Sequence, residues 1–126
     1  MIATKRTLLT DQERADRALT GGELQRQITD LATMLGWSWC HWRALKNGRG
    51  FWQVPVEGPL GTGWPDLFLA HPVKVRLLGI EVKRELGDRL TPEQEASHDL
   101  LRRSGLDVHV FRQSDMTAGR IEEALR

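Results

Sequence analysis

The sequence predicts a single α/β or α+β domain, a mixed β-sheet flanked by helices in the order α-β-β-β-α-β-α. Helix-start signals followed by apolar residues at helical spacing occur in two segments, residues 20–36 and 91–105. Two strands joined by a short turn lie between them at residues 63–83, and another strand follows at residues 108–111. A chain of 126 residues is long enough for one real core but short for two ordinary domains.

The amino-terminal residues 1–19 are polar and mixed in charge, so we expect an arm or a short, loosely attached helix there, capped by Thr10 with Glu13. Residues 20–126 are expected to form the single domain. The clearest helix starts at Thr20, because Thr20 and Glu23 have the spacing of a capping box. Gly36 is expected to end this helix, whose apolar positions are Leu24, Ile28, Leu31 and Leu35.

An aromatic segment, WSWCHW at residues 37–42, predicts a strand after this helix. Residues 43–62 are rich in glycine and hold two prolines, which predicts mainly loop with a short strand at 51–54. Three basic residues without an acidic neighbour, Arg43, Lys46 and Arg49, occupy residues 41–50. They are candidates for contact with phosphates, although a basic solvated loop explains them as well.

The segment 63–83 reads as an antiparallel pair of strands around a turn at residues 72–74. Side chains alternate across a strand, so Leu78, Ile80 and Val82 face one way. Glu81 and Lys83 face the other way, and Asp66 on the first strand falls opposite one of them. Two carboxylates and an ammonium on one face are a plausible seat for a divalent metal; the alternative is a set of cross-strand ion pairs on a wet sheet face.

The second half of the chain continues with helix and strand signals. Thr91 caps a helix with proline at its first position and Gln94 at its third, and Gly105 ends it. A strand follows at residues 108–111, and Asp115 is expected to cap a last helix that runs through Leu125.

Composition excludes several classes of protein. The formal net charge is +1, so bulk charge does not indicate a nucleic-acid partner. A lone cysteine, Cys40, excludes an intramolecular disulfide and a multi-thiolate zinc site, and fits a reducing cell interior. No apolar run approaches the ~20 residues of a membrane-spanning helix, and the amino terminus does not resemble a signal peptide.

Four blocks together resemble the virus-type replication-repair nuclease (VRR-NUC) domain of the PD-(D/E)XK nuclease superfamily. They are GGELQRQITDLATMLGW, GWPDLFLA, GIEVK and LTPEQEASHDLLRRSGLDVHVF, in this order and on the expected element types. The resemblance implies a restriction-endonuclease-like core. By position it implies Asp66, Glu81 and the carbonyl of Val82 as ligands of Mg²⁺ or Mn²⁺, with Glu23 as a further ligand, directly or through water.

The resemblance also implies Lys83 as the catalytic lysine, with Glu23 and Gln94 as further active-site residues. Hard oxygen ligands such as carboxylates suit Mg²⁺ and Mn²⁺ better than zinc, and Lys83 could stabilise phosphorane charge or position the attacking water. From local sequence, Glu23 and Gln94 have an equally good explanation as helix caps. Trp64 and His41 are further candidates for contact with nucleic acid, and core packing is the common alternative for both.

The predicted function is therefore metal-dependent endonuclease activity on DNA, with branched DNA such as a four-way junction as the implied substrate. The resemblance implies a homodimer, and action in the cytoplasm of a bacterium or of a phage-infected host. Two alternatives stay open: a non-catalytic DNA-binding or assembly subunit that keeps the nuclease fold, and a nuclease that acts on RNA.

Overall fold

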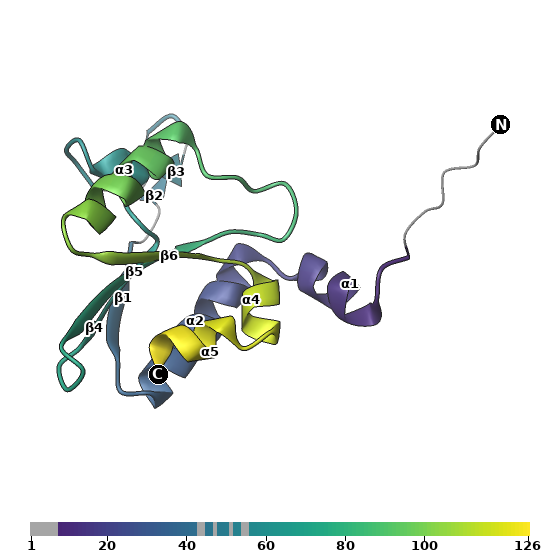
Figure 1. Ribbon diagram of the computed structural model, residues 1–126. Helices are drawn as coiled ribbons and strands as arrows, with labels where there is room; N and C mark the ends of the chain where they lie inside the picture. Colours follow the sequence, from purple (N-terminus) through teal and green to yellow (C-terminus); the bar gives the residue numbers. More distant parts are fainter. Residues whose placement is uncertain (1–7, 43–44, 47, 51, 54–55) are drawn as a thin grey trace.

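The computed structural model describes residues 8–42, 45–46, 48–50, 52–53 and 56–126. A four-stranded sheet in the order β1-β4-β5-β6 forms its centre, with helices on both faces (Figure 1). The sheet is mixed, because β1, β4 and β5 pair antiparallel and β5 and β6 pair parallel. Its strands are β1 (Ser38–His41), β4 (Leu67–His71), β5 (Arg76–Val82) and β6 (Asp107–Phe111). The predicted fold class, a mixed sheet flanked by helices, is confirmed.

The helices begin and end where local sequence provides caps. The helices are α1 (Asp11–Ala18), α2 (Gly21–Met34), α3 (Pro92–Arg103), α4 (Gln113–Thr117) and α5 (Arg120–Leu125), with a 3₁₀ turn, η1 (Gly61–Gly63). Thr20 caps α2 and Thr91 caps α3, and each helix has the full capping box that the sequence predicts. Gly36 and Gly105, both with positive φ, follow the two helix ends.

The core lies between one face of the sheet and the helices α2 and α5. Leu78 and Ile80 of β5 are fully buried there, as predicted from their alternation, and so are Leu67 and Leu69 of β4. Ile28 of α2 completes the contact. The helix α3 covers the opposite face (Figure 1), the face that carries Glu81. The chain thus places its predicted polar patch under α3 rather than in open solvent.

The β4–β5 hairpin has the predicted register. Leu67 pairs with Ile80 in antiparallel register. Asp66 precedes Leu67 and Glu81 follows Ile80, so the two acidic residues lie next to each other at one end of the hairpin. The turn spans residues 72–75, and Val75 adopts a positive φ of 53°. The two candidate carboxylates therefore lie at the same end of the sheet as the carboxyl end of β6.

Two minor elements differ in part from the prediction. The expected loop at 43–62 contains a second small ribbon, in which β2 (Leu45–Lys46) pairs with β3 (Trp52–Gln53); the predicted short strand at 51–54 matches β3, with its ends outside the described residues. The last helix is divided, because Gly119 at φ 79° interrupts it between α4 and α5. Asp115 lies inside α4 and accepts from the backbone N–H of Arg112 instead of occupying the cap position.

The helix α1 forms where a short helix was predicted, and it is docked on the domain. The buried carboxylate of Asp16 accepts a hydrogen bond from the hydroxyl of Thr117 in α4 at 2.8 Å. Thr10 caps α1 as predicted. Residues 1–7 lie outside the described part of the chain. None of the described helices is both long and apolar enough to span a bilayer.

Candidate active site at the end of the β4–β5 hairpin

Glu81 is the centre of the candidate site, and its carboxylate is almost fully buried at 2% exposure. The Nζ atom of Lys83, the residue directly after β5, lies 3.7 Å from the Oε1 atom of Glu81. Burial is the main cause that raises the pKa of Glu81 to about 8; the neighbouring carboxylate of Asp66 raises it further, and the ammonium of Lys83 opposes the shift. The predicted convergence of Asp66, Glu81 and Lys83 is thus present in the structure.

Asp66 is held in place by the backbone of the neighbouring strand. Its Oδ2 atom accepts a 2.7 Å hydrogen bond from the N–H of Val82. The segment that leads into Asp66 starts at Gly63 in η1. A Cβ atom at Gly63 would lie 2.4 Å from the backbone oxygen of Glu93 and 2.5 Å from Oγ of Ser97. Only glycine lets η1 pack this close to α3, and this packing fixes the Trp64-Pro65 segment that leads into Asp66.

Gln94 makes the contacts of a helix cap and also contacts the candidate site. Its side-chain oxygen accepts from the backbone N–H of Thr91 at 3.0 Å, which completes the capping box of α3. Its side-chain nitrogen donates to Oε1 of Glu81, also at 3.0 Å. An amide has both an acceptor and a donor, so a single residue can cap the helix and hold the carboxylate.

His98 is a residue of this site that the sequence reasoning missed. It lies one turn after Gln94 on α3, its side chain is completely buried, and its Nε2 atom is 3.4 Å from Oε2 of Glu81. Burial, together with the nearby guanidinium of Arg102, lowers the pKa of His98, so the imidazole is neutral at neutral pH. The i, i+4 spacing from Gln94 was the available signal, since it places both side chains on one face of α3.

The carboxylate oxygens of this site fit a hard divalent cation that keeps some of its coordination positions for substrate. Oε2 of Glu81 is buried and has no hydrogen-bond partner among the described residues, and Asp66 brings a second carboxylate beside it. Within the described part of the chain, no three His, Cys, Asp or Glu side chains cluster as metal ligands. Two carboxylates, with further positions left for water and phosphate oxygens, match the way proteins bind Mg²⁺.

Glu23 lies apart from this cluster. It is exposed on the first turn of α2, and its carboxylate accepts from the backbone N–H of Thr20 at 3.0 Å. The structure gives it the contacts of a helix cap. No contact with Asp66, Glu81 or Lys83 occurs among the described residues, so its role as a metal ligand stays a prediction.

The predicted nucleic-acid contacts have different positions. Trp64 is half-buried beside the site, stacked on Phe68 with ring centroids 6.5 Å apart, and edge-on to Trp42. His41 pairs with Leu67 and so points to the α2 side of the sheet, away from the face of Asp66. Arg49 is exposed after β2; Arg43 and the side chain of Lys46 lie outside what the structure describes.

Comparison with known proteins agrees with the resemblance seen in the sequence. Residues 57–115 match the family model of the VRR-NUC domain. A solved structure described as a VRR_NUC domain is similar with a TM-score of 0.56 and 24% sequence identity, over 82% of this chain and 97% of that chain. No curated protein matches the sequence. The matched segment holds Asp66, Glu81, Lys83, Gln94 and His98.

Proposed function

We propose, from the match of residues 57–115 to the VRR-NUC domain model, that the protein is a divalent-metal-dependent endonuclease that hydrolyses DNA phosphodiester bonds. The observation that carries the proposal is the buried carboxylate of Glu81, with Asp66 and Lys83 beside it at the end of the hairpin. A nuclease-type domain alone leaves the chemistry open, whereas this constellation supplies oxygen ligands and a cation at one point.

Each side chain has a defined task in this proposal. Asp66 and Glu81 hold Mg²⁺ or Mn²⁺, together with the carbonyl of Val82; when bound, the metal lowers the pKa of water and draws charge from the phosphate. Lys83 stabilises the negative charge that develops on the phosphate oxygens. Gln94 and His98 are positioning residues, because they touch Glu81 and orient its carboxylate.

The substrate that we propose is branched DNA, cleaved by a homodimer in the cytoplasm of a bacterium or a phage-infected host. A two-fold dimer presents two equal sites to two opposed strands, which is the symmetry of a four-way junction. Light scattering of the purified protein tests the dimer. A monomer that still resolves junctions would remove the symmetry argument.

The direct test measures cleavage of labelled junction, flap, single-stranded and duplex DNA, with ribo-substrates in parallel, in Mg²⁺, Mn²⁺ or EDTA. We expect cleavage only with metal, and a loss of at least about 10²-fold in Asp66→Ala and Lys83→Ala. Lys74→Ala, at an exposed lysine in the hairpin turn, is the control and should retain full activity. Cleavage that persists in EDTA would falsify the mechanism, and DNA binding without products under any metal would favour a non-catalytic subunit.

A further inference from the structure

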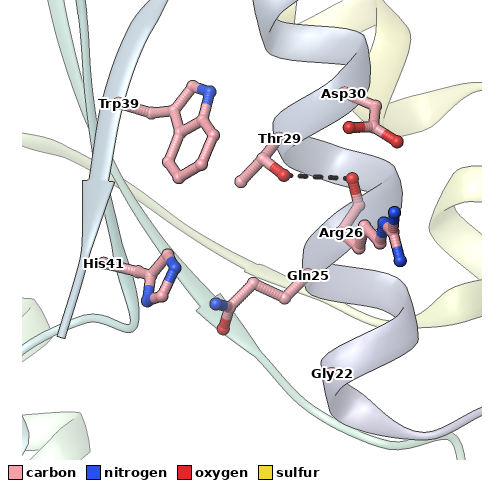
Figure 2. A pocket seen from close by; sticks show the side chains of 7 residues that line it. All are labelled: Gly22, Gln25, Arg26, Thr29, Asp30, Trp39 and His41. Atoms are coloured by element: carbon pink, nitrogen blue, oxygen red, sulfur yellow. Dashed lines mark hydrogen bonds between the residues drawn. The ribbon is translucent and has the colours of Figure 1, made fainter. Parts of the chain in front are cut away.

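A groove of about 350 Å³ lies between α2 and β1, outside the cluster around Glu81 (Figure 2). Figure 2 shows Trp39 and His41 on β1 pointing across the groove toward Thr29 and Gln25 of α2. The volume is within the range of pockets that hold small organic groups. No residue of the proposed catalytic machinery lines it, so it needs an explanation of its own.

One wall of the groove is an aromatic platform. The rings of Trp39 and His41 are stacked, with centroids 5.8 Å apart and planes 11° from parallel. Trp39 is 39% exposed although it is one of the largest apolar side chains in the chain. Its indole N–H donates to the hydroxyl of Thr33 at 2.9 Å, which fixes the orientation of the ring. The platform is therefore both oriented and accessible.

The opposite wall is polar but carries no net charge. Gln25 has an amide with donors and an acceptor, and among the described residues it makes no hydrogen bond. Arg26 and Asp30 also line the groove, and their charges are opposite. A phosphate site needs an excess of positive charge, which this groove lacks. A flat ring with polar edges, such as a nucleobase, matches an aromatic platform facing an amide.

The groove also adjoins the end of the sheet at which we place the chemistry. His41 pairs with Leu67, the residue that follows Asp66, and β1 is the edge strand of the sheet. Along β1, His41 lies nearest to the position of Asp66, and Trp39 follows on the same face. Gln25 and Gly22, which line the groove, belong to the first half of α2, at the same end of the sheet.

We propose that this groove binds an unpaired nucleobase of the DNA substrate, near the cleaved phosphate. The inference rests on the proposed function, since it assumes that DNA is the ligand. It narrows the substrate class to DNA with at least one unpaired nucleotide beside the cleavage position, as at flaps, gaps and the centres of branched molecules.

The test measures binding in EDTA, so that it does not depend on cleavage. Fluorescence anisotropy with a short labelled oligothymidylate and with a blunt DNA hairpin gives affinities for unpaired and paired DNA. We expect Trp39→Ala to weaken oligothymidylate binding about 5- to 150-fold, the range for removing one base–aromatic stack, and to leave hairpin binding within about twofold. Trp39→Phe should keep most of the affinity because it keeps a ring.

Two further variants make the result specific. His41→Ala removes the other ring of the platform and should also weaken oligothymidylate binding, which keeps the test valid if Trp39→Ala does not fold. Leu100→Ala, at an exposed apolar residue on α3, is the control for truncation of surface area and should bind like the wild type. Circular-dichroism melting establishes that each variant is folded.

The binding and cleavage measurements together decide the matter. Weakened oligothymidylate binding with unchanged hairpin binding supports the nucleobase site. Equal affinities for wild type and both ring variants, or equal losses on the two DNAs, would overturn it. Metal-dependent cleavage with no effect of Trp39 would leave the proposed function intact while refuting the groove, whereas a ring-dependent affinity without any cleavage would refute the nuclease and retain the groove.

Discussion

A protonated Glu81 is the resting state that burial imposes on the metal-free protein near neutral pH. A carboxylate at 2% exposure, beside the second carboxylate of Asp66, binds its proton more tightly than in water. Lys83 reduces this tendency without reversing it. In the proposed nuclease, Asp66 and Glu81 would hold the divalent cation, and Glu81 would have to release its proton to do so, which would link metal binding to proton release.

The first prediction concerns stability against pH in EDTA. The pKa of Glu81 rises from 4.5 in the unfolded chain to about 8 in the folded protein. Stability from this group is therefore complete below pH 4.5 and is lost as pH rises through about 8, by at most about 5 kcal/mol. Thermal unfolding between about pH 6 and about pH 9 should show a falling Tm.

The control for that prediction is Glu81→Gln, which keeps the shape of the side chain and cannot ionise. Its Tm should change less over the same pH range, and it should exceed the wild type at high pH. Mg²⁺ should raise the wild-type Tm more at high pH than at low pH, because fewer protons compete with it. Parallel pH profiles for the two proteins would contradict the assignment.

The second prediction concerns His98. His98→Leu fills the buried position with an apolar side chain and removes the nitrogen that faces Glu81. We therefore expect kcat to fall about 10- to 100-fold and the Mg²⁺ concentration required for activity to rise. KM for DNA should not change, because His98 is completely buried and cannot touch the substrate. His98→Gln, which retains a donor, should recover part of the activity. A loss of folding stability with normal kcat and Mg²⁺ dependence would reduce His98 to a core residue.

The residues of the site were predicted unequally, for physical reasons. Asp66, Glu81 and Lys83 follow from strand alternation and hairpin register, which local sequence determines. The dual contact of Gln94 depends on where α3 docks on the sheet, so spacing within the helix could indicate a cap but could not show the second bond. His98 was not predicted, because a histidine within a helix cannot be assigned to a site until the strand that faces it is known.

Among the secondary-structure elements, capped helices and the β4–β5 hairpin were predicted well, and the irregular parts were not. Thr20 and Thr91 fix the starts of α2 and α3 through bonds to neighbours in sequence. The β2–β3 ribbon comprises two residues a side and pairs across a glycine-containing turn, so no alternation was long enough to reveal it. The expected last helix runs unbroken through Leu125, whereas the left-handed conformation of Gly119 divides it.

The third prediction concerns the start of α3. Gln94→Glu keeps an acceptor for the capping box but replaces the donor to Glu81 with a negative charge. At low pH, where the site is protonated, we expect α3 in the Gln94→Glu variant to keep its stability. At neutral pH, we expect DNA cleavage by this variant to fall about 10- to 100-fold. Gln94→Ala should lose both the cap and the contact. If Gln94→Glu cleaves like the wild type, the amide serves only as a cap.

At the scale of the whole molecule, the buried hydrophobic cluster of the described residues lies entirely after α1. The buried cluster begins at Leu24 and ends at Leu125, and α1 contributes no apolar residue to it. The helix α1 adds a polar contact, from Thr117 to Asp16, at the rim of the domain. A mixed sheet flanked by helices was predictable from the order of elements along the chain. The contact between Thr117 and Asp16 links residues far apart in sequence and left no local pattern.

The fourth prediction follows from that arrangement. A chain that begins at Thr20 should fold cooperatively, with a Tm lower by only a few degrees, and should keep its cleavage activity. Asp16→Ala in the full chain is the matched variant, since it removes the contact but leaves the helix. A truncated chain without a cooperative transition would show that residues 1–19 belong to the domain rather than to an appendage.

The shared amide of Gln94 also has a consequence for motion. Since one side chain holds both the first turn of α3 and the carboxylate of Glu81, opening of that turn must free the carboxylate as well. Local opening of helix ends is observed as hydrogen exchange of backbone amides. The N–H of Thr91 donates to the side chain of Gln94, so its hydrogen-exchange rate should decrease when a cation occupies the site. This decrease would report occupancy of the site from a helix that touches no metal.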